Sequence, residues 1–124
     1  MKAISTTKAP AAIGPYSQAA QSGNLLFVSG QLPIDPQSGN MVEGFEAQAK
    51  MVFANLQAIL KEAGMSFANV IKASVFLKDM NDFAQLNQIY AGYFEAPFPA
   101  REAIQVARLP KDALVEISVI AVKE

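Results

Sequence analysis

The segment Phe45–Lys78, FEAQAKMVFANLQAILKEAGMSFANVIKASVFLK, changes its hydrophobic period once, and this change decides the fold. In the first half, apolar residues recur every three or four positions, which predicts an amphipathic helix that ends near Gly64. These residues are Phe45, Ala49, Val52, Phe53, Leu56, Ile59 and Leu60. From Val70 to Lys78 the pattern alternates instead, so we expect a strand. Its buried face would carry Ile71, Ala73, Val75 and Leu77.

The residues before this segment predict a hairpin. Ser17–Ser22 and Leu25–Gln31 are the expected strands, and Gly23-Asn24 between them is a two-residue loop that tolerates positive φ. Residues 35–40, DPQSGN, form a further turn.

The residues after it predict a second helix and two more strands. Asp82 and Gln85 have capping-box spacing, and Phe83, Leu86, Tyr90 and Phe94 supply the apolar positions of the helix. Pro97 and Pro99 close it. Arg101–Arg108 and Leu114–Val122 are the expected last two strands.

This order of elements indicates an α+β fold, with a single, mostly antiparallel sheet and two helices on one face. No linker or repeat interrupts the sequence, so we expect one domain over residues 1–124. Two helices cover only one face of the sheet, and the other face still carries apolar residues. We therefore expect a homo-oligomer.

Composition excludes several kinds of chemistry. The chain has 124 residues, a net charge of −1, no cysteine and no histidine, so disulfides, thiolate catalysis and imidazole bases are absent. We expect no metal site and no cofactor. The balanced charge gives no attraction to nucleic acid or anionic membranes. The N-terminus has no signal-peptide pattern, and no apolar stretch is long enough to span a membrane, so we expect a cytoplasmic protein.

Glu116 is the most informative single residue. It lies within the apolar strand LVEISVI, residues 114–120, where an ionised carboxylate is costly unless it is paired, hydrated or in a cleft. A catalytic base or water-holding residue is one interpretation. A glutamate at a sheet edge or facing solvent is the other, with about equal weight from the sequence alone.

Arg101 follows Pro97-Phe98-Pro99-Ala100, so its guanidinium projects from a stiff segment and could bind a carboxylate through two parallel hydrogen bonds. An ordinary surface ion pair is the alternative. Arg108, before Leu109-Pro110, fits a structural or interfacial role better.

Two small motifs add hydroxyl groups beside turns. Gly14-Pro15-Tyr16-Ser17 places a phenol and a hydroxyl next to a tight turn. Ser29-Gly30-Gln31 places a hydroxyl where a ligand can approach the backbone. Turn chemistry alone also explains both motifs.

Taken together, these motifs resemble the reactive intermediate deaminase family, also called RidA/YjgF. The quoted segments are GPYSQA at 14–19, FVSGQ at 27–31, FPAR at 98–101, VARLP at 106–110 and VEI at 115–117, with IAV at 120–122. The resemblance covers essentially the whole chain, and FPAR with the downstream VEI is its specific part.

The resemblance implies a chorismate-mutase-like fold and a homotrimer with clefts at the subunit interfaces. It implies hydrolysis of 2-imino acids, such as 2-iminobutanoate and 2-iminopropanoate, to 2-keto acids and ammonia. The substrate-carboxylate ligand falls on Arg101 and the water-activating residue on Glu116. The residues that line the cleft fall on Tyr16, Ser29 and Asn87. Ala103 stands where many members carry a cysteine, and its backbone N–H remains a possible ligand contact.

Three other functions stay open. A regulatory trimer would hold a keto acid or another small carboxylate without turnover. A ribonuclease or translation inhibitor is disfavoured by the net charge and the lack of a basic stripe. A chorismate-mutase-like enzyme would rest on fold analogy alone.

Overall fold

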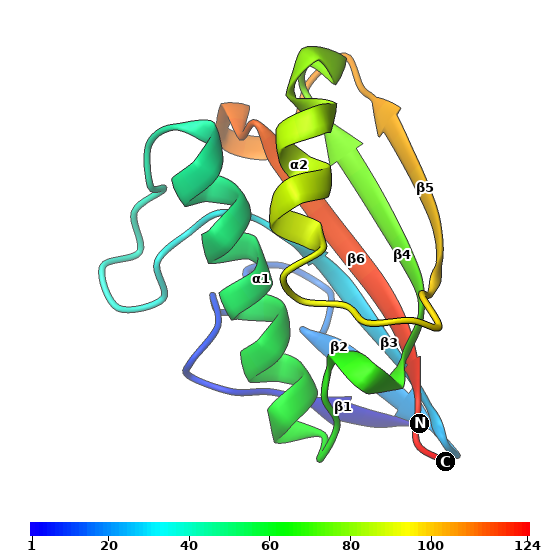
Figure 1. Ribbon diagram of the computed structural model, residues 1–124. Coiled ribbons are helices and arrows are strands. Elements are labelled where there is room, and N and C mark those ends of the chain that lie inside the picture. The colour runs from blue at the N-terminus through cyan, green and yellow to red at the C-terminus, as the bar shows by residue number, and fades with distance from the viewer.

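The structure, a computed structural model, describes all 124 residues and places both long helices on one face of a six-stranded sheet (Figure 1). The strands are β1 Lys2–Ile4, β2 Ala19–Ser22, β3 Leu25–Gln31, β4 Val70–Leu77, β5 Ala100–Gln105 and β6 Val115–Val122. The helices are α1 Phe45–Glu62 and α2 Phe83–Tyr90, with short 3₁₀ turns at Phe67–Asn69, Met80–Asp82 and Pro110–Asp112. The expected α+β class, single sheet layer and one-sided helices are confirmed.

The strand order across the sheet is β1-β2-β3-β6-β4-β5. Every neighbouring pair is antiparallel except β4 and β5, which are parallel and are joined by a crossover through α2. The last strand, β6, therefore lies at the centre and pairs with both β3 and β4. β5 forms one edge of the sheet (Figure 1).

The core lies between the helices and the sheet. α1 buries one stripe of its surface against β6 and β3, which include Leu26, Val28, Ile117 and Val119 among the core residues. This burial of apolar surface is the main force that holds the helices on the sheet. The 18-residue α1 is the helix that the three- and four-residue spacing predicted.

An aromatic cluster fills the space where α1, α2 and the loop after α2 meet. Phe53 stacks on Tyr93 with 4.3 Å between ring centroids, and Tyr90 stacks on Phe94 at 4.4 Å. Phe67 packs edge-on against Phe53 at 6.1 Å. The cluster fixes α2 relative to the sheet, and this placement matters for the site.

The opposite, open face of the sheet carries no helix. Alternation places Phe27, Ile104 and Glu116 on it, and Phe27 and Ile104 are 48 % and 47 % exposed. The expectation that apolar residues remain uncovered on this face is confirmed.

Several details differ from the sequence-based expectations. β1 was not expected. β2, β5 and β6 are shorter than the strands predicted at Ser17–Ser22, Arg101–Arg108 and Leu114–Val122. Ile71 is 45 % exposed, because a register shift between Val70 and Lys72 turns Val70, not Ile71, to the core.

The predicted capping box of α2 is wrong. The Asp82 side chain makes no capping hydrogen bond, because a 3₁₀ turn precedes the helix and Asp79 caps that turn through Asn81 N–H. α2 also ends at Tyr90, so Phe94 joins the core from the following loop.

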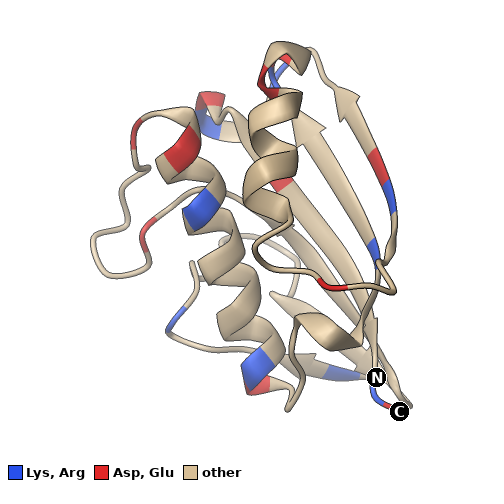
Figure 2. Ribbon diagram, viewed as in Figure 1, with Lys and Arg blue, Asp and Glu red and all other residues tan.

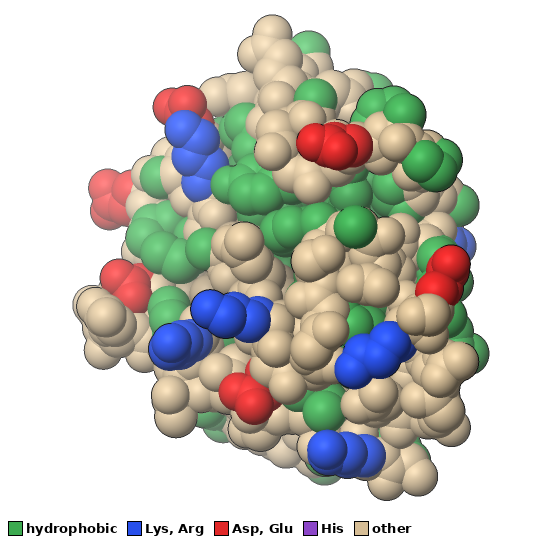
Figure 3. All heavy atoms as spheres, turned by 60° about the horizontal axis from the view of Figure 1, so that its bottom comes forward, with side chains coloured by type: hydrophobic (Ala, Val, Ile, Leu, Met, Phe, Trp, Pro, Cys, Tyr) green, Lys and Arg blue, Asp and Glu red, His purple; other side chains and the backbone are tan.

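Charged side chains are scattered over α1, the loops and the sheet (Figure 2). On the face turned forward in Figure 3, basic side chains alternate with acidic ones and do not form a stripe. No helix of the protein combines the length and the apolar character that crossing a bilayer requires.

Candidate functional site

Arg101 lies on the helix-covered face of β5, beside α2. It is in register with Ala73 of β4, which is buried in the core. Its Nη1 donates a hydrogen bond of 2.8 Å to Oδ1 of Asn87. Its guanidinium carbon lies 4.8 Å from the ring centroid of Tyr90 and 5.4 Å from that of Phe83, so the cation rests against two aromatic rings.

The two arginines of the chain differ in their ion pairs. Arg108 pairs with Asp112, with Nε to Oδ1 at 2.9 Å, whereas Arg101 forms no salt bridge within the chain. The charge of Arg101 is therefore free for an external anion. Arg108 has the structural contact that its sequence position indicated.

A cavity of about 390 Å³ opens beside the guanidinium. Tyr90, Ala91, Phe98, Pro99 and Arg101 line it. A single cation among apolar and aromatic walls is a suitable place for a small carboxylate, because the walls weaken the competition from water.

Glu116 lies on the open face, in register with Phe76 of β4. Its side chain is half-buried, and this burial raises the pKa of the carboxyl above its ordinary value. Burial is the cause of the raised pKa of Glu116, and no neighbouring charge contributes to it. A carboxylate with a raised pKa is a stronger proton acceptor than an exposed one, as a general base requires.

Gly30 supplies the space that Glu116 occupies. A Cβ atom built on Gly30 would lie 2.4 Å from Oε2 of Glu116, well inside van der Waals contact. The strand register between β3 and β6 shifts at this point, between Val28 and Gln31. The sequence motif Ser29-Gly30-Gln31 indicated only that a ligand can approach the backbone, and the contact between Gly30 and Glu116 was not predicted.

Ser29 directly precedes Gly30 in β3, and Tyr16 lines the same cavity as Gly30. The Ser29 hydroxyl donates a 2.6 Å hydrogen bond to the Ser17 carbonyl, which ties the turn after Gly14 to the bulge in β3. Tyr16 is 54 % exposed and lines a second cavity, of about 380 Å³, together with Gly30 and Lys111.

The six predicted site residues thus form two groups. Arg101, Asn87 and Ala103 lie on the helix-covered side, where Ala103 packs against the core. The other group, at the open face and the loop beside it, is Glu116, Ser29 and Tyr16. The sheet separates the two groups, so a single chain does not bring Arg101 and Glu116 together.

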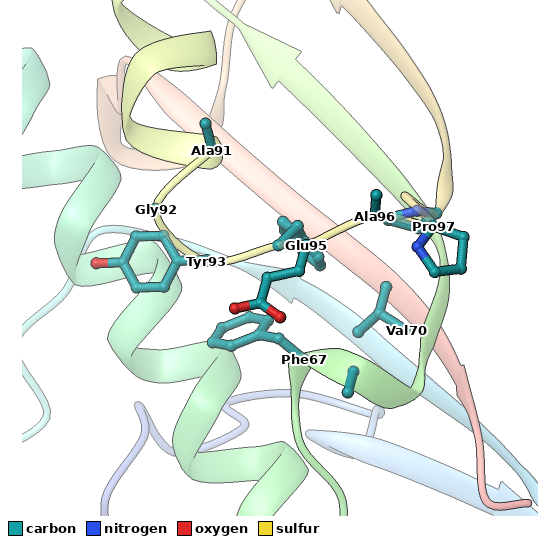
Figure 4. Close-up of a pocket in the computed structure, with 11 residues that line it drawn as sticks. Phe67, Val70, Ala91, Gly92, Tyr93, Glu95, Ala96 and Pro97 are labelled. Atoms are coloured by element: carbon teal, nitrogen blue, oxygen red, sulfur yellow. The ribbon is translucent and has the colours of Figure 1, made fainter.

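A third cavity, of about 340 Å³, lies between the loop after α2 and the 3₁₀ turn at Phe67–Asn69 (Figure 4). The Glu95 side chain extends toward the Phe67 ring in this cavity (Figure 4). None of the predicted site residues lines it. The protein has no cluster of three or more aspartate or glutamate side chains that could hold a metal ion.

Comparison with known proteins gives consistent matches over the whole chain. The model of the family described as Endoribonuclease L-PSP matches residues 6–123. A RutC family protein of Pyrococcus abyssi is 54 % identical over 98 % of this chain and 96 % of its own length. The mouse 2-iminobutanoate/2-iminopropanoate deaminase is also 54 % identical, over 98 % of this chain and 91 % of its own.

Among solved structures, Escherichia coli TdcF with bound serine superposes with a TM-score of 0.96. It is 44 % identical, and the match covers all of both chains. With the fold, the sequence motifs and these matches in agreement, the chain belongs to the Endoribonuclease L-PSP family, which is the RidA/YjgF family.

Proposed function

We propose that this chain is a cytoplasmic, homotrimeric deaminase that hydrolyses 2-imino acids to 2-keto acids and ammonia. The substrate class is that of 2-iminobutanoate and 2-iminopropanoate, after which its mammalian relatives are named. Other relatives of similar identity carry only the RutC family name, so the residues of the site are the main support for this activity.

The observation that carries the proposal is the unpaired guanidinium of Arg101. It is held by Asn87, faces a small cavity and has no carboxylate partner in the chain. A 2-imino acid has a carboxylate directly beside its C=N carbon, so a fixed arginine would also fix the reacting carbon. TdcF binds serine, which has the same carboxylate next to a nitrogen-bearing carbon.

Glu116 is the proposed base. As the oxygen of a water molecule bonds to the imine carbon, one water proton passes to the Glu116 carboxylate. That proton is then delivered to the nitrogen, which gives a carbinolamine. The Glu116 carboxylate takes the hydroxyl proton of this intermediate and passes it to the amino nitrogen, so that the C–N bond breaks, the carbonyl forms and ammonia leaves. Imines hydrolyse spontaneously, so positioning with general-base help of about 10²–10⁴-fold is sufficient. No metal or organic cofactor takes part in this route.

The separation of Arg101 and Glu116 by the sheet supports an oligomeric site. The edge strand β5 of one copy, packed toward the open face of the next, would bring one arginine group to one glutamate group. Tyr16, Ser29 and the Ala103 N–H would line the cleft between them. A homotrimer of this kind also covers Phe27 and Ile104.

The test is release of keto acid from an imine generated in situ by an amino-acid oxidase, measured above the spontaneous rate. The Glu116→Gln variant keeps the size and hydrogen bonding of the side chain but cannot accept the proton. We expect keto-acid affinity to be retained and turnover to fall by about 10²-fold or more. An unchanged rate in Glu116→Gln would remove Glu116 as the base. A parent rate no higher than the spontaneous one, with keto-acid binding intact, would favour the non-catalytic carboxylate-binding trimer.

A further inference from the structure

One face of α2 contacts Arg101. Phe83, Asn87 and Tyr90 are spaced four and three residues apart, so they lie on one face of the helix. All three contact the guanidinium, two through ring faces and one through a hydrogen bond. These three residues form an aromatic cradle for Arg101.

The geometry suits a guanidinium. Its donors lie in its plane, while its flat faces are weakly hydrated and stack on aromatic rings. Rings at 4.8 and 5.4 Å therefore support the cation and leave its edges for hydrogen bonds. Asn87 takes one N–H, and the remaining donors stay available for a carboxylate.

Tyr90 is the deeper of the two rings. It is buried, stacks on Phe94 and packs edge-on against Phe53, so the core fixes its orientation. Its hydroxyl is buried with no hydrogen-bond partner, and burial raises the pKa of the phenol. A hydroxyl closed off in this way is not presented to a ligand in the cavity, so the ring face is the part of Tyr90 that acts on Arg101.

We propose that Tyr90 is a positioning residue that holds the Arg101 guanidinium, through its ring face and not its hydroxyl, in the orientation that receives the substrate carboxylate. This inference rests on the proposed role of Arg101. It predicts that the ring is required and that the hydroxyl is dispensable.

Three variants separate these features. Tyr90→Phe keeps the ring and removes only the unpartnered hydroxyl, so 2-ketobutyrate affinity should stay within about twofold of the parent. Tyr90→Leu removes the ring face, and the dissociation constant and KM should rise by about 3–30-fold, while kcat changes less. Tyr93→Leu is the matched control, because Tyr93 belongs to the same aromatic cluster but does not contact Arg101.

A second readout does not depend on catalysis. The chain has only two arginines, so selective ¹⁵N labelling gives two guanidinium Nε signals. In the ligand-free protein, the Arg101 signal should show a ring-current shift and restricted motion compared with Arg108. Both features should persist in Tyr90→Phe and Tyr93→Leu. They should weaken in Tyr90→Leu, in which only Phe83 and Asn87 still contact the guanidinium.

The outcomes are distinct. Weak binding in Tyr90→Phe, or an unchanged Arg101 signal in Tyr90→Leu, overturns the positioning role. An equal loss of affinity in Tyr93→Leu also overturns it, because general packing would then explain the effect. If the imine assay fails for the parent but the Arg101 signal behaves as described, the deaminase proposal fails and the aromatic cradle stands.

Discussion

Two arginines seven positions apart illustrate how much a single side chain depends on its surroundings. Arg101 rests on the aromatic cradle without a carboxylate partner, whereas Arg108 is paired with Asp112. Lysine keeps the charge but loses the planar fork that matches a carboxylate. We expect Arg101→Lys to lower kcat/KM by about 10–100-fold and Arg108→Lys by less than about threefold.

Steady-state kinetics on the imine assay, with sedimentation to confirm equal oligomeric states, would check this prediction. Equal losses in both variants, with intact oligomers, would mean that the wrong arginine was assigned to the substrate.

The carboxyl of Glu116 predicts a measurable dependence of stability on pH. Burial raises its folded-state pKa above the ordinary value of 4.5, so between the two values the folded chain binds more protons than the unfolded chain. The stabilisation from this group is complete below the unfolded pKa and is lost as pH rises through the folded pKa. Glu116→Gln should therefore raise the thermal midpoint at pH 7 and leave it nearly unchanged at pH 4.

Glu102 is the matched control for this experiment. Hydrogen bonds from Ser74 and Lys72 lower the pKa of its carboxyl, so its contribution is present above the unfolded pKa and is lost as pH falls. Glu102→Gln should lower the midpoint at pH 7. Shifts of the same sign for both variants at pH 7 would contradict the assignment for Glu116.

At the scale of elements, the bulge in β3 controls the glutamate on the neighbouring strand. In Gly30→Ala, the new Cβ would meet the Glu116 carboxylate at 2.4 Å, so that side chain must move. The φ of Gly30 is outside the left-handed region, so alanine brings no backbone strain of its own. We expect turnover to fall by about tenfold or more while the fold is retained, since misplacing a base weakens general-base catalysis.

Gly92→Ala is the control, since its Cβ would approach only the Ile89 carbonyl, at 3.3 Å. Adding Glu116→Asp to Gly30→Ala shortens the carboxylate and should relieve the clash, which an increase in thermal midpoint over Gly30→Ala would reveal. If the thermal midpoint does not increase, the contact with Glu116 is not the cause of the lower stability of Gly30→Ala.

The helices and strands differ in how well their sequences predict them. Long periodic segments, such as α1 and β6, were predicted because their burial pattern follows one period throughout. The exposure of Ile71 was not predicted, because a register shift depends on the partner strand β6 and leaves no local pattern. The capping role of Asp79 was hidden by Asp82, whose spacing to Gln85 fits the same rule.

The candidate site also has features that the local sequence does not reveal. Motif similarity selected Arg101, Asn87 and Glu116, and the hydrogen bond between Arg101 and Asn87 confirms that two of them are neighbours. The sequence did not reveal that the sheet divides the predicted residues, because the face of β5 that carries Arg101 is set by its pairing with β4 and its contact with α2. The spacing of Phe83, Asn87 and Tyr90 was the available signal for the aromatic cradle.

At the scale of the whole molecule, the divided site predicts complementation between inactive variants. Arg101→Lys and Glu116→Gln chains, co-expressed with different tags and purified as mixed oligomers, should regain activity. If each site takes its arginine from one copy and its glutamate from the next, every mixed trimer has about one site in three with both groups intact. Activity near that fraction of the parent is the expected result.

Mixtures of the separately purified variants, never unfolded together, are the control and should stay inactive. No recovery in confirmed mixed oligomers would place both groups in one copy. Sedimentation of the parent at about three chains per particle is expected alongside, and a clean monomer would contradict the interfacial site.

The central position of β6 has a consequence for synthesis. The strands β1-β2-β3 and the pair β4-β5 share no hydrogen bonds, and only β6, the last element of the chain, connects them. Residues 115–122 are synthesised after both half-sheets and both helices. The nascent chain therefore cannot close its core until Val115–Val122 have been made. An early stop codon before Val115 would leave most of the secondary structure encoded, yet it would release two half-sheets without the strand that joins them.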